Sequence, residues 1–213
     1  MTAAVFLDRD GVLCENRADY VKDWAEFTWI PGAWEALRIF ARLEQPVVLV
    51  TNQSAINRGL TTLDAVHDLH QRMGRAIVEA GGRLDGVYVC PHRPEEGCPC
   101  RKPGLQLFHR AADDLSLDLP RSFLIGDSMS DVQAGLALNL QVILVRTGLG
   151  SETAVRLGSL ARRVHVAENV LEAARWIESG RMEETAHWGA GDSRPATLSP
   201  ADRAHAPALP RAE

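Results

Sequence analysis

Long hydrophobic runs are missing from this sequence of 213 residues. No apolar stretch approaches the roughly 20 residues that a membrane-spanning helix needs, and the segment from Met1 to Asp8 lacks the basic region of a secretory signal. A basic excess is missing too, because 23 lysines and arginines stand against 28 acids, for a net charge of −5. Proteins that bind nucleic acids or anionic membranes are usually basic. We therefore expect a cytoplasmic protein with neither kind of partner.

Cysteine is scarce, which argues against a disulfide-stapled scaffold. Of the four cysteines, Cys90, Cys98 and Cys100 lie within eleven residues, together with His92. Thiolates and imidazole bind zinc, and a Cys3His set is typical of tetrahedral structural sites. Four protein ligands leave no open coordination position, so we expect the zinc to be structural rather than catalytic. Buried or redox-active cysteines are the alternative, and Cys14 is expected to be a core or loop thiol.

Short apolar runs alternate with amphipathic stretches. The runs cover residues 3–7, 46–51, 86–90, 122–126 and 141–146, and helical spacing of apolar residues covers 33–41 and 66–80. Further helices are expected to start near Pro103 and Ser130. This alternation predicts an α/β fold, a doubly wound parallel sheet with helices on both faces. Ligands of such sheets bind at the carboxyl ends of the strands.

The last part of the chain differs from the rest. From Gly180 the apolar periodicity ends, and prolines recur up to Pro210. We predict a flexible tail over residues 180–213 and one domain over residues 1–179.

Acidic residues follow two of the predicted strands. Asp8 and Asp10 come after the first run, and Asp127 comes after the fourth. Carboxylates that meet at one sheet edge repel each other unless a cation lies between them, and Mg²⁺ prefers oxygen ligands. A charged loop is the alternative. Asp131 either caps the following helix or supports this site.

Phosphate-binding groups are expected at the same edge. Thr51 ends the second run and is followed by Asn52, Gln53 and Ser54, and Arg101 and Lys102 come directly after Cys100. An ordinary polar loop and a solvated basic pair are the alternatives. Acids, a metal and nearby cations suit phosphoryl transfer. Because a P-loop and a serine or cysteine nucleophile elbow are missing, a carboxylate is the expected nucleophile, forming an aspartyl-phosphate intermediate.

Four motifs together resemble the haloacid dehalogenase-like phosphatase superfamily: Asp8-Arg9-Asp10-Gly11, Thr51-Asn52-Gln53-Ser54, Arg101-Lys102-Pro103 and Gly126-Asp127. The Cys-Pro-His and Cys-Pro-Cys insert is similar to the branch of D-glycero-D-manno-heptose 1,7-bisphosphate phosphatases and histidinol-phosphate phosphatases. The likeness covers about residues 3–178. It implies a Rossmann-like fold of the haloacid dehalogenase type, with a small zinc loop over residues 90–100 in place of a large cap domain.

The resemblance implies a Mg²⁺-dependent sugar-phosphate phosphatase. Heptose 1,7-bisphosphate, converted to heptose 1-phosphate, is the leading substrate, and histidinol phosphate or another small monoester is the alternative. By resemblance, Asp8 is the nucleophile, Asp10 the general acid and base, and Asp127 a Mg²⁺ ligand beside Asp8 and the Asp10 backbone carbonyl. Thr51 and Lys102 hold the transferred phosphoryl group.

The remaining substrate contacts are also implied by the resemblance. Arg101 contacts the rest of the substrate, and the residues expected to shape the sugar pocket are Asn52, Gln53, Ser54, Asn16, Arg17, Asp19 and Tyr20. Family members often carry glycine at Ala55 and lysine at Ser128. A catalytically inactive, zinc-stapled binding module is the alternative from another functional class. We expect a monomer, since neither closed metal site needs a partner chain.

Overall fold

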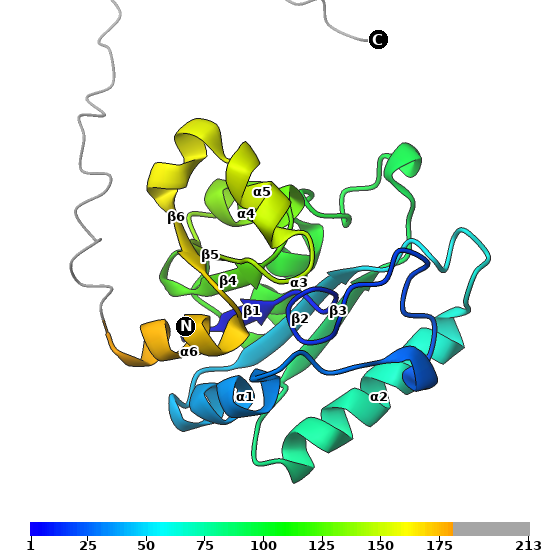
Figure 1. The fold of residues 1–213 in the computed structure, drawn as a ribbon, viewed down its shortest axis with the longest axis horizontal. Coiled ribbons are helices and arrows are strands. Elements are labelled where there is room, and N and C mark those ends of the chain that lie inside the picture. The colour runs from blue at the N-terminus through cyan, green and yellow to red at the C-terminus, as the bar shows by residue number, and fades with distance from the viewer. Residues whose placement is uncertain (181–213) are drawn as a thin grey trace, which may run out of the picture. The chain divides into compact units, whose positions relative to one another are not determined.

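Six parallel strands form one sheet in the order β3-β2-β1-β4-β5-β6 (Figure 1). This computed structural model describes residues 1–180, so the predicted tail, apart from Gly180, lies outside the described residues. The strands are β1 (Val5–Leu7), β2 (Val47–Asn52), β3 (Gly86–Cys90), β4 (Phe123–Gly126), β5 (Gln141–Val145) and β6 (Val164–Ala167). The doubly wound parallel fold predicted from the sequence is confirmed, with β6 as an addition.

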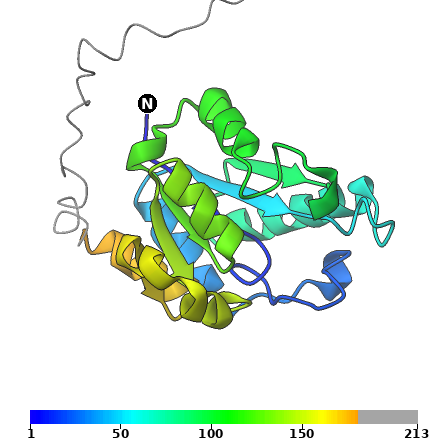
Figure 2. The same ribbon diagram turned by 90° about the horizontal axis from the view of Figure 1, so that it is seen from above.

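Helices cover both faces of the sheet. They are α1 (Ala33–Arg42), α2 (Leu63–Glu79), α3 (Gln106–Leu115), α4 (Met129–Ala137), α5 (Gly150–Arg156) and α6 (Val170–Glu178). Short 3-10 turns are η1 (Trp24–Glu26), η2 (Pro94–Glu96), η3 (Leu119–Arg121) and η4 (Gly158–Arg163). Figures 1 and 2 show α1, α2 and α6 on one face and α3 and α4 on the other. Right-handed crossovers in this strand order require the placement of α1 to α4, and α6, which follows the last strand, packs on α1.

The core is built from alternate residues of the central strands. Phe6, Val48 and Val50 point toward α3, where the Phe6 and Phe108 rings meet edge to face with centroids 5.3 Å apart. Side chains alternate along a strand. The opposite face therefore carries Val5 and Leu7 of β1 and Val47 and Leu49 of β2. Both strand faces are buried, which explains why these strands are continuous apolar runs.

The strand order places the site. Chain direction across the sheet reverses between β1 and β4, since β2 and β3 lie on one side and β5 and β6 on the other. Ligands bind outside the carboxyl ends of strands at such a switch point. Among the described residues, no cap domain interrupts the segments between strands, and no helix is long and apolar enough to cross a membrane.

Candidate active site and zinc loop

Three carboxylates meet at the switch point. Asp8 directly follows β1, Asp127 directly follows β4, and Asp131 lies in the first turn of α4. One oxygen from each lies within 4.8 Å of the others. The structure therefore brings together Asp8 and Asp127, as predicted from their places after neighbouring strands.

Asp131 has two roles that the sequence left as alternatives. Its backbone amide donates to the Ser128 hydroxyl, and its carboxylate accepts from the Ser128 amide at 3.1 Å, which caps α4. Its other oxygen lies 2.6 Å from Lys102 Nζ. Asp131 thus fixes the start of α4 and also holds the cation of the site.

Lys102 lies against two carboxylates of this acidic cluster, Asp8 and Asp131. Its ammonium group is buried, lies 3.1 Å from Asp8 Oδ1 and donates to the Val50 carbonyl at 2.7 Å. Burial by itself lowers the pKa of a lysine, but the Asp131 and Asp8 carboxylates outweigh it and raise the pKa of Lys102 to about 12. The site therefore keeps one fixed positive charge beside Asp8.

One lysine does not balance three acids. Burial first, and then the neighbouring Asp131 and Asp10, raise the pKa of Asp8 to about 6 despite Lys102. Burial, Asp8 and Asp131 raise the pKa of Asp127 to about 8. Both shifts come first from burial and then from like charges, so the fully ionised cluster is unfavourable as it stands. A hard divalent cation with oxygen ligands offsets this repulsion, so the residues present fit Mg²⁺.

Two glycines shape the space around Asp127. Gly11 and Gly148 both have positive φ angles, 82° and 57°, and a Cβ atom at either position would collide with Asp127 Oδ2. The Leu149 amide donates to this same oxygen at 2.8 Å. The Thr147 hydroxyl donates to the Gly11 carbonyl at 2.6 Å, which joins the two glycine turns. The backbone thus fixes the position of Asp127.

Polar residues at and just after the end of β2 point in different directions. Asn52 Nδ2 donates to the Lys102 carbonyl at 3.2 Å, and Asn52 Oδ1 accepts from the Lys102 amide at 3.0 Å. This side chain, predicted to contact the sugar, therefore holds the Lys102 backbone. Thr51, Gln53 and Ser54 are buried, and the side-chain amide of Gln53 donates to Thr51 Oγ1 at 2.8 Å.

The Asp10 side chain lies apart from the three-carboxylate cluster. Its carboxylate accepts from Gln53 Nε2 at 2.7 Å and from the Arg9 guanidinium at 2.9 Å. Arg9, which belongs to the motif Asp8-Arg9-Asp10-Gly11 but has no predicted role of its own, is fully buried. The alternation of side chains beyond β1 was the available signal, since it turns Arg9 away from Asp8 toward the opposite helix layer.

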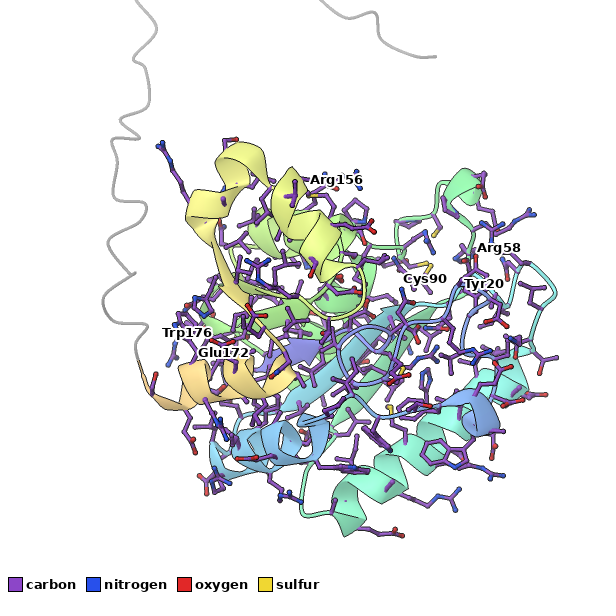
Figure 3. All side chains as sticks on the ribbon, in the orientation of Figure 1. Tyr20, Arg58, Cys90, Arg156, Glu172 and Trp176 are labelled. Carbon is purple, nitrogen blue, oxygen red and sulfur yellow. The ribbon has the colours of Figure 1, made fainter. Side chains whose placement is uncertain are left out.

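The predicted sugar-contacting loop is exposed. Asn16, Arg17 and Asp19 are all exposed, and Arg17 pairs with Asp19 at 3.2 Å. Lys22 binds Asp19 at 2.8 Å and so closes the turn. Figure 3 shows Tyr20 on the side of the molecule where β2 and β3 end. Among the described residues, the ion pairs of this loop join its side chains to one another and to the nearby Lys22 and Glu26, rather than to the acidic cluster.

Cys90, His92, Cys98 and Cys100 form a second compact cluster. Sulfur–sulfur distances are 3.3–3.6 Å, and His92 Nδ1 lies 3.1 Å from Cys100 Sγ and 3.6 Å from Cys90 Sγ. A tetrahedral zinc with bonds of about 2.0–2.3 Å separates its ligands by roughly 3.5–3.8 Å. The donor set and its spacing therefore fit zinc.

The zinc loop is joined to the active-site segments. The Cys90 carbonyl accepts from the backbone amide of Gln53 at 2.7 Å, and the His92 carbonyl accepts from Arg101 Nη1 at 3.1 Å. Asn57, in the loop after β2, binds Glu96 of the zinc loop at 2.9 Å. The first two contacts place Arg101 and Lys102 beside the end of β2, and the Asn57–Glu96 bond is a separate, exposed contact.

Comparison with known proteins gives a consistent result. A family described as HAD-hydrolase-like matches residues 99–173. The D-glycero-beta-D-manno-heptose-1,7-bisphosphate 7-phosphatase of Bordetella bronchiseptica is 35% identical over 173 residues, covering 81% of this chain and 96% of that protein. The Helicobacter pylori J99 protein of the same name is 41% identical over 145 residues, covering 68% and 83%.

A solved structure matches as well. The crystal structure of D,D-heptose 1,7-bisphosphate phosphatase from B. bronchiseptica, complexed with magnesium and phosphate, has a TM-score of 0.79 at 33% identity and covers 84% of this chain and 99% of that one. The resemblance inferred from the motifs is therefore confirmed. The chain belongs to the haloacid dehalogenase-like phosphatases, in the family of the heptose 1,7-bisphosphate phosphatases.

Proposed function

We propose that this protein removes the 7-phosphate of D-glycero-β-D-manno-heptose 1,7-bisphosphate in a Mg²⁺-dependent reaction. The names of its relatives support this substrate. The observation that carries the proposal is the contact of Asp8 with Lys102 Nζ at 3.1 Å, inside a cluster of carboxylates at the sheet's switch point. It provides a nucleophile, a phosphate-binding cation and a cation site in one place.

The reaction proceeds in two displacements. In the first, an Asp8 oxygen bonds to phosphorus, the bond from phosphorus to the sugar oxygen breaks, and Asp10 gives a proton to that oxygen. In the second, Asp10 takes a proton from water, the water oxygen bonds to phosphorus, and the phosphorus–Asp8 bond breaks. The products are heptose 1-phosphate and inorganic phosphate.

The other residues of the site hold charge. Lys102 and Thr51 bind the phosphoryl oxygens, and Lys102 lowers the repulsion between phosphate and Asp8. Asp8 and Asp127, with the Asp10 backbone carbonyl, would hold Mg²⁺, which supplies positive charge against the phosphate oxygens.

The substrate contacts and chain organisation complete the proposal. Arg101 and the loop from Asn16 to Tyr20 contact the sugar and its second phosphate. The phosphatase domain comprises residues 1–179 and acts as a monomer, since each cluster draws all its residues from one chain.

Phosphate release tests the function. We expect release from the β anomer of heptose 1,7-bisphosphate that depends on added Mg²⁺, faster than release from the α anomer or from histidinol phosphate. The control is magnesium-depleted protein that retains its zinc. Faster turnover of histidinol phosphate would reassign the substrate, and no release from any phosphomonoester would support an inactive binding module instead.

A further inference from the structure

A second polar cluster lies beside Asp10, outside the metal and phosphate contacts described above. Its centre is Arg9, whose side chain has no exposed surface. A buried guanidinium is unfavourable unless protein partners replace the water that it loses. The partners of Arg9 therefore indicate what this charge does.

The pleat of the chain turns Arg9 away from the catalytic acids. Asp8 points to the side of Lys102, and Arg9 points to the opposite layer, where its Nη1 lies 3.3 Å from His70 Nε2 on α2. Burial and the nearby guanidinium lower the pKa of His70 to about 3. The imidazole is therefore neutral and accepts the Arg9 hydrogen bond. This contact fixes one end of the guanidinium to α2.

The other end of Arg9 holds the Asp10 carboxylate. Nη2 lies 2.9 Å from both Asp10 oxygens, and Nε lies 3.1 Å from Oδ1. Arg9 Nη2 also donates to the Val21 carbonyl at 3.3 Å. A fork of charge-assisted hydrogen bonds constrains the direction and plane of a carboxylate more than one bond does. Arg9 therefore orients the side chain that follows it.

Gln53 completes this arrangement. Its Oε1 accepts from Arg9 Nη2 at 2.8 Å, and its Nε2 donates to Asp10 Oδ2 at 2.7 Å and to Thr51 Oγ1 at 2.8 Å. Rotating the amide by 180° would place its donor against the Arg9 donor. Both amide hydrogens are used and the side chain is buried. Gln53, predicted as a sugar contact, is thus directed inward.

Asp10 remains accessible while it is held. Its side chain keeps 23% of its surface exposed, so its protein partners do not enclose it fully. We propose that Arg9 and Gln53 are positioning residues that fix the Asp10 carboxylate for its two proton transfers. This inference rests on the proposed function, in which Asp10 is the general acid and base. It assigns neither residue a contact with substrate.

Substrates with different leaving groups distinguish a misplaced Asp10 from a general loss of active-site structure. A sugar alkoxide must be protonated as its bond to phosphorus breaks, whereas 4-nitrophenolate leaves readily without a proton. A misplaced Asp10 therefore slows the first displacement for a sugar phosphate more than for 4-nitrophenyl phosphate. The second displacement needs Asp10 with either substrate, so the Asp8 phosphoenzyme accumulates with the nitrophenyl ester.

Gln53→Met, which keeps the side-chain size and removes both donors, is the main test. We expect kcat for the sugar phosphate to fall about 10- to 100-fold, less than the full 10²–10⁴-fold typical of general acid and base catalysis, because Asp10 itself is still present. With 4-nitrophenyl phosphate, stopped-flow absorbance should show a burst of about one nitrophenolate per protein before a slow steady state. Arg9→Lys, which keeps the charge and loses the fork, should show the same pattern.

Two further variants make the result decisive. Asp10→Asn should show the same burst, followed by an even slower steady state. If its loss of activity does not depend on the leaving group, the proposed role of Asp10 fails rather than this inference. Ser122→Ala removes buried hydrogen bonds to Ala4 and Asp118 at the opposite end of β4 and should leave both substrates' kinetics unchanged. Equal first-turnover losses on both substrates in Gln53→Met, or wild-type kinetics in it, would overturn the positioning role.

Discussion

The two candidate metal sites among the described residues are both compact but are assembled differently. The four zinc-loop ligands come from eleven consecutive residues, whereas Asp8, Asp127 and Lys102 are separated by long stretches of chain. A bound metal can hold the first cluster together, because its ligands are already close along the chain. The second exists only when β1 and β4 pair in parallel.

This difference suggests an order of support, in which the zinc loop helps to position the active-site residue Lys102. Lys102 is two residues beyond Cys100 and is also bound through its backbone by Asn52 at the end of β2. The zinc cluster therefore holds the chain next to Lys102, and Asn52 at the end of β2 fixes the Lys102 backbone against the sheet. The following changes separate these contributions.

Asp8→Asn should have the largest effect on activity. Removing the nucleophile should lower kcat by roughly 10³-fold or more, while zinc content stays at about one ion per chain. Phosphate release and metal analysis measure the two. Retained activity would exclude Asp8 as the nucleophile, and lost zinc would mean that the two clusters are not independent in this direction.

Cys98→Ser should disrupt the zinc cluster and, through it, the active site. We expect the zinc to be lost and the midpoint of thermal unfolding to fall by at least about 6 °C, since about 3 kcal/mol corresponds to roughly 6–12 °C in a protein of this size. Activity should fall as well, because Lys102 loses its support. Cys14→Ser, which changes a buried thiol outside the cluster, should keep the zinc. A fully stable, zinc-free Cys98→Ser protein would contradict a structural zinc.

Magnesium should change how stability depends on pH. The folded pKa of Asp127, about 8, is above its ordinary value of 3.8, so the folded metal-free protein binds more protons than the unfolded chain between these values. Stability of the metal-free protein is therefore full below about pH 4 for this group and falls as pH rises toward 8. Thermal unfolding between pH 5 and 9 should show this fall, reduced by saturating Mg²⁺.

Asp127→Asn is the matched control for this pH dependence. The amide does not ionise, so the fall in stability of the metal-free protein should become smaller. The added Mg²⁺ should then stabilise the variant less than the wild type. An unchanged slope in the variant would show that Asp127 is not its source.

Asn52→Ala should have the smallest effect. Losing the two hydrogen bonds to the Lys102 backbone should lower kcat by about 10-fold, the equivalent of ~1.4 kcal/mol, with KM changed less. Asn57→Ala, which removes an exposed contact to Glu96, serves as the control. A rise in KM with unchanged kcat would instead return Asn52 to the sugar-binding role predicted from the sequence.

The sequence allowed most of the central fold to be predicted. Buried strands such as β1 and β2 are continuous apolar runs, and α1 and α2 repeat apolar residues at helical spacing. Strand β6 was missed because its four residues include His165 and follow two arginines, so no apolar run marks it. Its identity depends on pairing with β5, which is a tertiary contact.

The same limit applies to the site. Residue type and position after a strand predicted the meeting of Asp8 with Asp127, and local spacing predicted the zinc cluster. The directions of Asn52 and Gln53 were not predictable, because two neighbouring polar residues at a strand end face opposite layers and each finds partners distant in sequence. The capping and ion-pairing of Asp131 likewise required coordinates.

The glycine turns around Asp127 have a consequence for altering this enzyme. Neither Gly11 nor Gly148 has room for a methyl group, so libraries that randomise them would yield damaged proteins rather than new specificities. The exposed positions Asn16, Arg17 and Asp19 can be randomised without such a collision. Substitutions there leave the backbone that shapes the reaction centre intact.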